Sequence, residues 1–137
     1  MTETIERLLD KSYWIIDILP EQVPKDSPGQ YFAVERWFRK EQMAAIRQKH
    51  INTVLKLNCY DDLTFVRENE EKSLNPEPAR IAEIMKERYV YILVGDAMIL
   101  SEPDDIYMTL FNADDELVEK VRRIAGSEGL FVWKGVG

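Results

Sequence analysis

The sequence predicts a single α+β domain: a mostly antiparallel sheet with helices packed on one face. Three observations predict it. The chain of 137 residues has the length of one domain. Apolar runs of strand length are joined by short turns, such as Gly95 and Asp96, and short turns favour hairpins and antiparallel pairing. Helical patterns lie between these strands, and no repeat or linker divides residues 1–137, so we expect one shared core.

The first part of the chain predicts a helix, a strand and a long loop. Thr2 is a suitable cap for a short helix over residues 2–10, in which the apolar residues recur at helical spacing. Residues 13–19 are rich in aromatic and β-branched side chains, which predicts a strand, and Asp17 is the exception in this apolar run. Three prolines and a glycine predict a long loop over residues 20–29.

Residues 31–38 fit two structures. As a strand, they place aromatic residues on both faces; as a helix, they would be capped by Ser27 with Pro28 as the first helical residue. We favour a strand that continues into a helix over residues 39–50. The alternation of residues 51–57 then predicts another strand.

Turn and cap residues delimit the elements of the second half. We expect Asn75 to cap one helix, and Asn112 to cap another that ends at Gly126. The remaining predictions are a loop over residues 67–74 and strands over residues 63–66, 89–94, 97–100, 106–111 and 130–133.

Composition disfavours several classes of partner. The net charge is −7, divided into −1 for residues 1–68 and −6 for residues 69–137, and an acidic protein repels the phosphates of nucleic acids. Because no apolar run approaches the 18–20 residues or so that span a bilayer, we expect no membrane partner. The single cysteine cannot form an intrachain disulfide, which favours a cytoplasmic location.

The shortage of reactive side chains makes catalysis the less favoured hypothesis. His50 and Cys59 are the only histidine and cysteine, so a catalytic triad would have to use His50 and a cysteine-rich zinc site is excluded. At the expected C-terminal end of a helix, His50 has a structural explanation in the helix dipole. We expect Cys59 to be a small buried hydrophobic residue, as free cysteines often are.

The aspartate doublets at residues 61–62, 104–105 and 114–115 suggest a site for a hard cation. Each doublet also has a local explanation, since two mark turns and one begins a helix. We therefore predict no metal site and no cofactor.

One basic segment, residues 36–50, is the most plausible binding surface. Arg36, Trp37, Arg39 and Lys40 combine positive charge with an aromatic side chain, which suits an anionic ligand or an acidic partner. Trp37 is a candidate exposed anchor, whereas we expect Trp14 and Trp133 to lie in the core.

Two functional hypotheses follow. The favoured one is a small acidic protein that works by binding a protein partner or itself, as a possible homodimer. The alternative is a small-molecule-binding protein or an enzyme with a site near residues 20–29 and the basic segment. Asp17, Glu35 and His50 would then be the catalytic acid–base candidates.

Residues 12–24, SYWIIDILPEQVP, and residues 29–35, GQYFAVE, resemble a conserved uncharacterised bacterial protein family. The resemblance covers the first quarter of the chain. It implies no activity, cofactor or partner.

Overall fold

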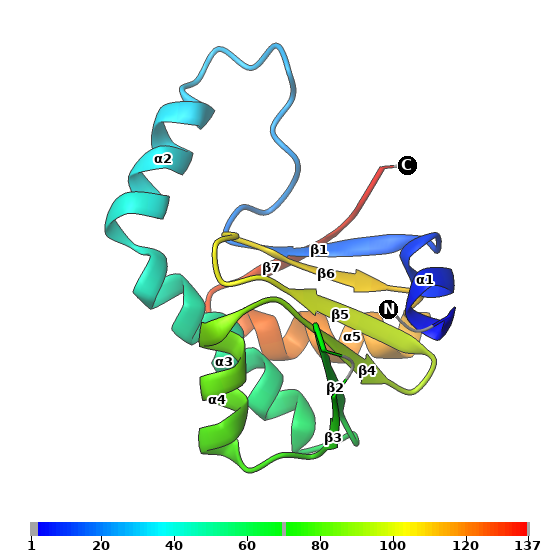
Figure 1. The fold of residues 1–137 in the computed structure, drawn as a ribbon. Coiled ribbons are helices and arrows are strands. Elements are labelled where there is room, and N and C mark those ends of the chain that lie inside the picture. Colours follow the sequence, from blue (N-terminus) through cyan, green and yellow to red (C-terminus); the bar gives the residue numbers. More distant parts are fainter. Residues whose placement is uncertain (1–2, 70, 137) are drawn as a thin grey trace.

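Seven strands form one antiparallel sheet in the order β3-β2-β4-β5-β6-β1-β7 (Figure 1). The computed structural model describes residues 3–69 and 71–136. The strands are β1 (Tyr13–Asp17), β2 (Thr64–Arg67), β3 (Lys72–Leu74), β4 (Val90–Val94), β5 (Ala97–Ser101), β6 (Met108–Phe111) and β7 (Phe131–Lys134). The predicted α+β class and the antiparallel sheet are confirmed.

The described residues form five helices: α1 (Glu3–Leu9), α2 (Tyr31–Glu41), α3 (Met43–Asn58), α4 (Pro78–Glu87) and α5 (Asp115–Gly126). Three of them, α3, α4 and α5, cover one face of the sheet. α3 packs against both α4 and α5, and the main core lies between these three helices and the sheet. α1 packs on the opposite face, where Ile5 and Leu8 contact strand residues of a second, smaller core.

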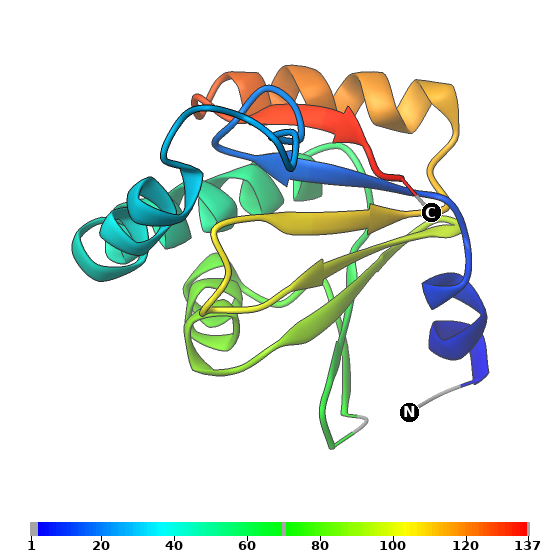
Figure 2. The same ribbon diagram turned by 90° about the horizontal axis from the view of Figure 1, so that it is seen from above.

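α2 projects away from this body, at the end of a long loop over residues 18–30 (Figure 1 and Figure 2). The strand that we favoured for residues 31–38 is wrong, and the helical alternative is right. The helix begins at Tyr31, with Gln30 at its N-cap, rather than at Pro28.

α3 is longer than predicted and includes residues 51–57, so the strand predicted there is wrong. The apolar residues of this segment satisfy two patterns at once. Ile51, Val54 and Leu57 recur every three residues, and all three are buried against the main core. Thr53 is also buried, and its hydroxyl donates to the carbonyl of Lys49 one turn earlier, at 2.8 Å.

Two asparagines expected at helix caps occupy turns instead. Asn75 and Asn112 have φ values of 45° and 59°, a left-handed conformation that asparagine tolerates well. α4 has Glu77 at its N-cap, and α5 is capped by Asp114, which accepts a hydrogen bond from the Leu117 amide at 2.8 Å.

The other predicted elements are present, with boundaries shifted by a few residues. The loop predicted over residues 67–74 contains the short strand β3. Thr2, the cap predicted for the first helix, lies outside the described residues, while the helix itself is confirmed as α1.

Candidate functional site

The projecting helix α2 carries apolar side chains that the described chain leaves uncovered. None of its residues is buried. Phe32, Val34 and Trp37 are 74%, 41% and 54% exposed. Its inward side consists of the half-buried Tyr31 and Phe38, together with Glu35 and Arg39. α2 thus exposes three large apolar side chains to solvent.

Arg39 attaches α2 to the loop between β5 and β6. Its guanidinium donates to the carbonyl of Asp104, lies 3.8 Å from the Asp105 carboxylate and lies 3.6 Å from the Glu35 carboxylate. The Asp104–Asp105 doublet is therefore part of an internal contact. Arg36 and Lys40, by contrast, are exposed and form no ion pair with the described residues.

Arg47 holds the same loop from the interior. It is buried, and its guanidinium donates to the Ser101 hydroxyl at 2.8 Å and to the carbonyl of Glu102. Burial lowers the pKa of Arg47 to about 10, while nearby acidic side chains, Asp105 first among them, oppose that shift. Two arginines predicted to be in one basic segment thus stabilise an acidic loop of the same molecule.

His50 lies in the middle of α3 rather than at the end of a helix, so its predicted position is wrong. It is fully buried, and neither ring nitrogen has a hydrogen-bond partner. Burial, reinforced by the nearby Arg47, lowers the pKa of His50 to about 3, and the backbone of Ile106 opposes this only in part. The imidazole is therefore neutral at physiological pH.

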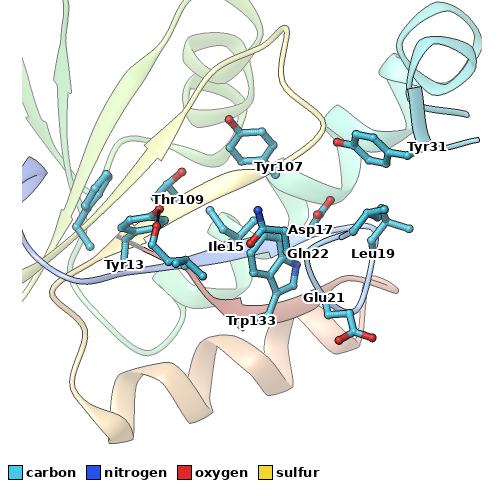
Figure 3. A pocket seen from close by; sticks show the side chains of 14 residues that line it. Tyr13, Ile15, Asp17, Leu19, Glu21, Gln22, Tyr31, Tyr107, Thr109 and Trp133 are labelled. Carbon is cyan, nitrogen blue, oxygen red and sulfur yellow. Dashed lines mark hydrogen bonds between the residues drawn. The ribbon is translucent and has the colours of Figure 1, made fainter. Parts of the chain in front are cut away.

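A groove lies on the face of the sheet opposite α3, α4 and α5, over strands β6, β1 and β7. Alternate residues of β1, namely Tyr13, Ile15 and Asp17, line it, while Ile16 faces the main core. In the strand register, Ile15 lies between Thr109 of β6 and Trp133 of β7. These three neighbouring residues form the floor of the groove. The groove has a volume of about 470 Å³, and Figure 3 shows the side chains around it.

Asp17 is the buried acidic group of this groove. Only 7% of the residue is exposed, and its carboxylate accepts a hydrogen bond from the Ile18 amide at 2.7 Å. Burial raises the pKa of Asp17, and the negative charge of Glu35 adds to the rise. Backbone amides and the indole of Trp133 oppose it. That indole faces the carboxylate without the geometry of a hydrogen bond, so its buried N–H has no partner.

Acidic neighbours also raise the pKa values of two tyrosines on the wall of the groove. Tyr31 donates to the Glu35 carboxylate at 3.1 Å, and burial followed by Glu35 raises the pKa of Tyr31. Burial, followed by Asp105, raises the pKa of Tyr107. Acidic neighbours thus add to the effect of burial at both tyrosines.

Gly135 allows the C-terminal segment to close one end of the groove. Its amide donates to the carbonyl of Tyr13 at 2.9 Å, and the Tyr13 hydroxyl donates to the carbonyl of Val136 at 2.7 Å. A Cβ atom at Gly135 would lie 1.9 Å from the Tyr13 ring, so only glycine permits this approach. The position of Tyr13 in the groove depends on it.

The structure brings together only some of the residues suggested by the sequence. The negative charge of Glu35 raises the pKa of Asp17, which lines the groove, whereas neither Glu35 nor His50 lines it. Cys59, expected to be buried, is exposed at the end of α3. Trp14 packs partly against the main core, as expected, but Trp133 is half-buried in the groove.

Sequence reasoning did not propose Tyr107 or Trp133 as site residues. Strand alternation could have identified Trp133, because its side chain lies on the opposite face of the strand from the buried Val132. The approach of Tyr107 depends on the loop between β5 and β6, which carries no such periodic signal.

The remaining aspartate doublets have local partners. Asp61 accepts from Lys120 at 2.9 Å, Asp62 accepts from the Asn75 amide at 2.8 Å, and Asp114 caps α5. Within residues 3–69 and 71–136, no cluster of three or more histidine, cysteine or acidic side chains is arranged to hold a metal ion. In the same part of the chain, every helix is too short or too polar to cross a membrane.

Comparisons with known protein families, curated proteins and solved structures find no match for this chain.

Proposed function

We propose that this protein works by binding, that α2 is its interaction element, and that the partner is a second copy of the chain. The observation that carries the proposal is the uncovered apolar surface of α2, with Trp37 and Phe32 both more than half exposed. Large apolar patches on the surface of a folded protein mark interaction sites, and an amphipathic helix that docks by its apolar side is a recurrent mode.

The charge distribution supports a second copy as the partner. Residues 31–50 contain five basic and two acidic residues, a net charge of +3, which leaves −10 on the rest of the chain. The outward side of α2 contributes Arg36 and Lys40, both exposed. We call α2 the arm and the rest of the chain the body. The positive charge of the arm is complementary to the acidic body of another copy.

One acidic surface fits this role by its position. Exposed Asp96 in the β4–β5 turn and exposed Asp115 and Glu116 at the start of α5 lie at the end of the molecule opposite α2 (Figure 1). They form no ion pair with the described residues. We call these three residues the acidic end.

Opposite positions of the arm and the acidic end suit a two-fold dimer. If two copies lie antiparallel, the α2 of each reaches the acidic end of the other, and both contacts form at once. Two-fold dimers are the commonest oligomers. Charge sets the orientation of such a pair, and most of the binding energy comes from aromatic anchors such as Trp37.

The same proposal includes a cytoplasmic location and no membrane or nucleic-acid partner. Its support is the acidic composition and the single cysteine.

The test is a dilution series of the full chain, followed by sedimentation velocity at low and high salt. We expect a dimer at micromolar concentration that weakens as salt rises. Trp37→Ala should raise the dissociation constant about 30-fold, because truncation of an aromatic anchor costs about 2 kcal/mol. Tyr60→Ala is the matched control, since Tyr60 is an exposed aromatic residue, 72% exposed, outside α2.

Two results would contradict the proposal. A monomer at every concentration, even at low salt, excludes the second copy as the partner. A dimer with the same dissociation constant in wild type and Trp37→Ala excludes α2 as the interface.

A further inference from the structure

We propose that the groove over β6, β1 and β7 binds a small organic ammonium ion, held by the Asp17 carboxylate among aromatic side chains. The proposal concerns a different surface from the outward side of α2, and it stands whether or not the protein forms a dimer.

The charge of the groove selects the sign of the ligand. Asp17 and Glu21 are its charged lining residues within the described chain, and both are acidic. Glu35 adds negative charge from α2. Arg39, the basic group that acts on the lining residues Tyr31 and Tyr107, is engaged by Asp104 and Asp105 and does not line the groove. A cation therefore gains from entering, and an anion is repelled.

Asp17 is a buried acidic residue without a cationic partner among the described residues. The residue is more than nine-tenths buried, and its carboxylate forms no ion pair with any described residue. Buried charges in proteins are usually paired, since removing a charge from water is costly. Its hydrogen bond from the Ile18 amide stabilises the local turn, but a carboxylate has about four acceptor positions and retains capacity for a ligand.

The aromatic lining suits an organic cation better than a metal ion. Trp133, Tyr31 and Tyr107 lie around Asp17 in the groove (Figure 3). Aromatic faces attract ammonium groups through their quadrupoles, and they also bury the carbon atoms of the ligand. A hard metal ion requires several oxygen ligands, which this set of side chains does not supply.

The size of the groove limits the ligand to a small molecule. Its volume of about 470 Å³ lies within the range of about 300–1,000 Å³ that is usual for small-molecule sites. One compact amine with an aromatic or aliphatic body fits this space.

The experiment follows the indole N–H resonances of ¹⁵N-labelled protein by NMR. Trp133→Phe identifies the Trp133 signal among the three tryptophans of the chain. The probes are phenethylamine, its neutral analogue 2-phenylethanol and the anion phenylacetate. We expect phenethylamine to shift the Trp133 signal in a saturable way, the alcohol to bind about ten-fold more weakly, and phenylacetate to cause no shift.

Asp17→Asn is the decisive variant, because the amide retains an acceptor for the Ile18 N–H but has no charge. It should weaken phenethylamine binding about ten-fold and leave the alcohol unchanged. Glu83→Gln is the matched control, since Glu83 is exposed on α4, on the opposite face of the sheet, and does not line the groove, so the substitution should have little effect. The spectrum of each variant shows directly whether the fold is retained.

Three results of the comparisons, and one of the titrations themselves, would overturn the proposal. They are equal affinity for the amine and the alcohol, shifts that leave the Trp133 signal unaffected, and undiminished amine binding by Asp17→Asn. Absence of any saturable shift with phenethylamine and with tetramethylammonium would overturn it as well.

Discussion

α5 and α2 are amphipathic helices of similar length, 12 and 11 residues, but the fold buries the apolar side of only one. Val118, Val121 and Ala125 of α5 are buried, whereas α2 has no buried residue. The connections differ. Short segments join α5 to β6 and β7, and these strands fix it against the sheet, while α2 follows the long loop over residues 18–30. Two amphipathic helices of similar length can thus differ in what covers them, and here they also differ in their connections to the sheet.

The two helices also differ at their ends. α5 has the Asp114 cap, acidic residues in its first turn and Arg123 in its last, all of which stabilise a helix locally. α2 also has basic residues in its last turn, Arg39 and Lys40, but it has no side-chain cap and no acidic residue in its first turn. The less locally stabilised helix is the one that has no buried residue, which is consistent with stabilisation by a second molecule.

The largest expected effect comes from a matched pair of valines. Val121 in α5 is 1% exposed and Val34 in α2 is 41% exposed. Val121→Asp should lower the free energy of unfolding by about 3–5 kcal/mol, because it buries an unpaired charge. Val34→Asp should change it by no more than about 0.5 kcal/mol. Urea titrations at a concentration that keeps the protein monomeric measure both, and similar losses would contradict the contrast between the helices.

A smaller effect on stability is expected from His50, which is buried in α3. The pKa of His50 in the folded protein is about 3, below the ordinary value of 6.5. The unfolded chain therefore binds the proton first as the pH falls below 6.5, and stability is lost from there down towards the folded-state pKa. The slope is at most about 1.4 kcal/mol per pH unit.

Urea titrations between pH 6.5 and pH 5 test this prediction, because carboxylates titrate mostly below that range. His50→Leu is the control variant, since it retains a buried side chain without a titrating group. The slope should be smaller in His50→Leu than in wild type. Equal slopes would mean that His50 is not the group responsible.

The smallest stability effect concerns Asp17, at the end of β1. Burial raises its pKa, so ionisation of Asp17 destabilises the folded state at neutral pH. Asp17→Asn should raise the free energy of unfolding at pH 7 by up to about 1 kcal/mol, as often occurs when a functional charge is removed. The gain should disappear as the pH falls through the folded-state pKa towards 3.8, the ordinary value. A less stable Asp17→Asn at pH 7 would show that the carboxylate is already well satisfied.

The fold class was predictable from the sequence because strands and short turns repeat along the chain. The hairpin of β4 and β5 follows from an apolar run on either side of Gly95 and Asp96. Residues 51–57 were not predictable in the same way. Their apolar side chains fit both a two-residue and a helical period, and only packing against α5 and the sheet decides between them.

The candidate site was predictable only in part. Asp17 is conspicuous in the sequence as the one charge in an apolar strand, and Trp37 as an aromatic residue among basic ones. The groove itself depends on the register that places Ile15 between Thr109 and Trp133, residues far apart in the chain. Local sequence patterns contain no information on that register, nor on the exposure of α2.

The most direct test of the proposed function mixes two charge-reversed variants. One carries Arg36→Glu and Lys40→Glu in α2, and the other carries Asp96→Lys and Glu116→Lys in the acidic end. Lys72→Glu, on β3 at the far edge of the sheet, is a control that should dimerise normally.

Each reversed variant alone should be monomeric in native mass spectrometry, because both contacts of its dimer become repulsive. An equimolar mixture should form a heterodimer, since each arm then meets an end of opposite charge. Monomers in the mixture as well as in the separate samples would contradict the pairing of α2 with the acidic end. Homodimers of either variant alone would contradict it equally.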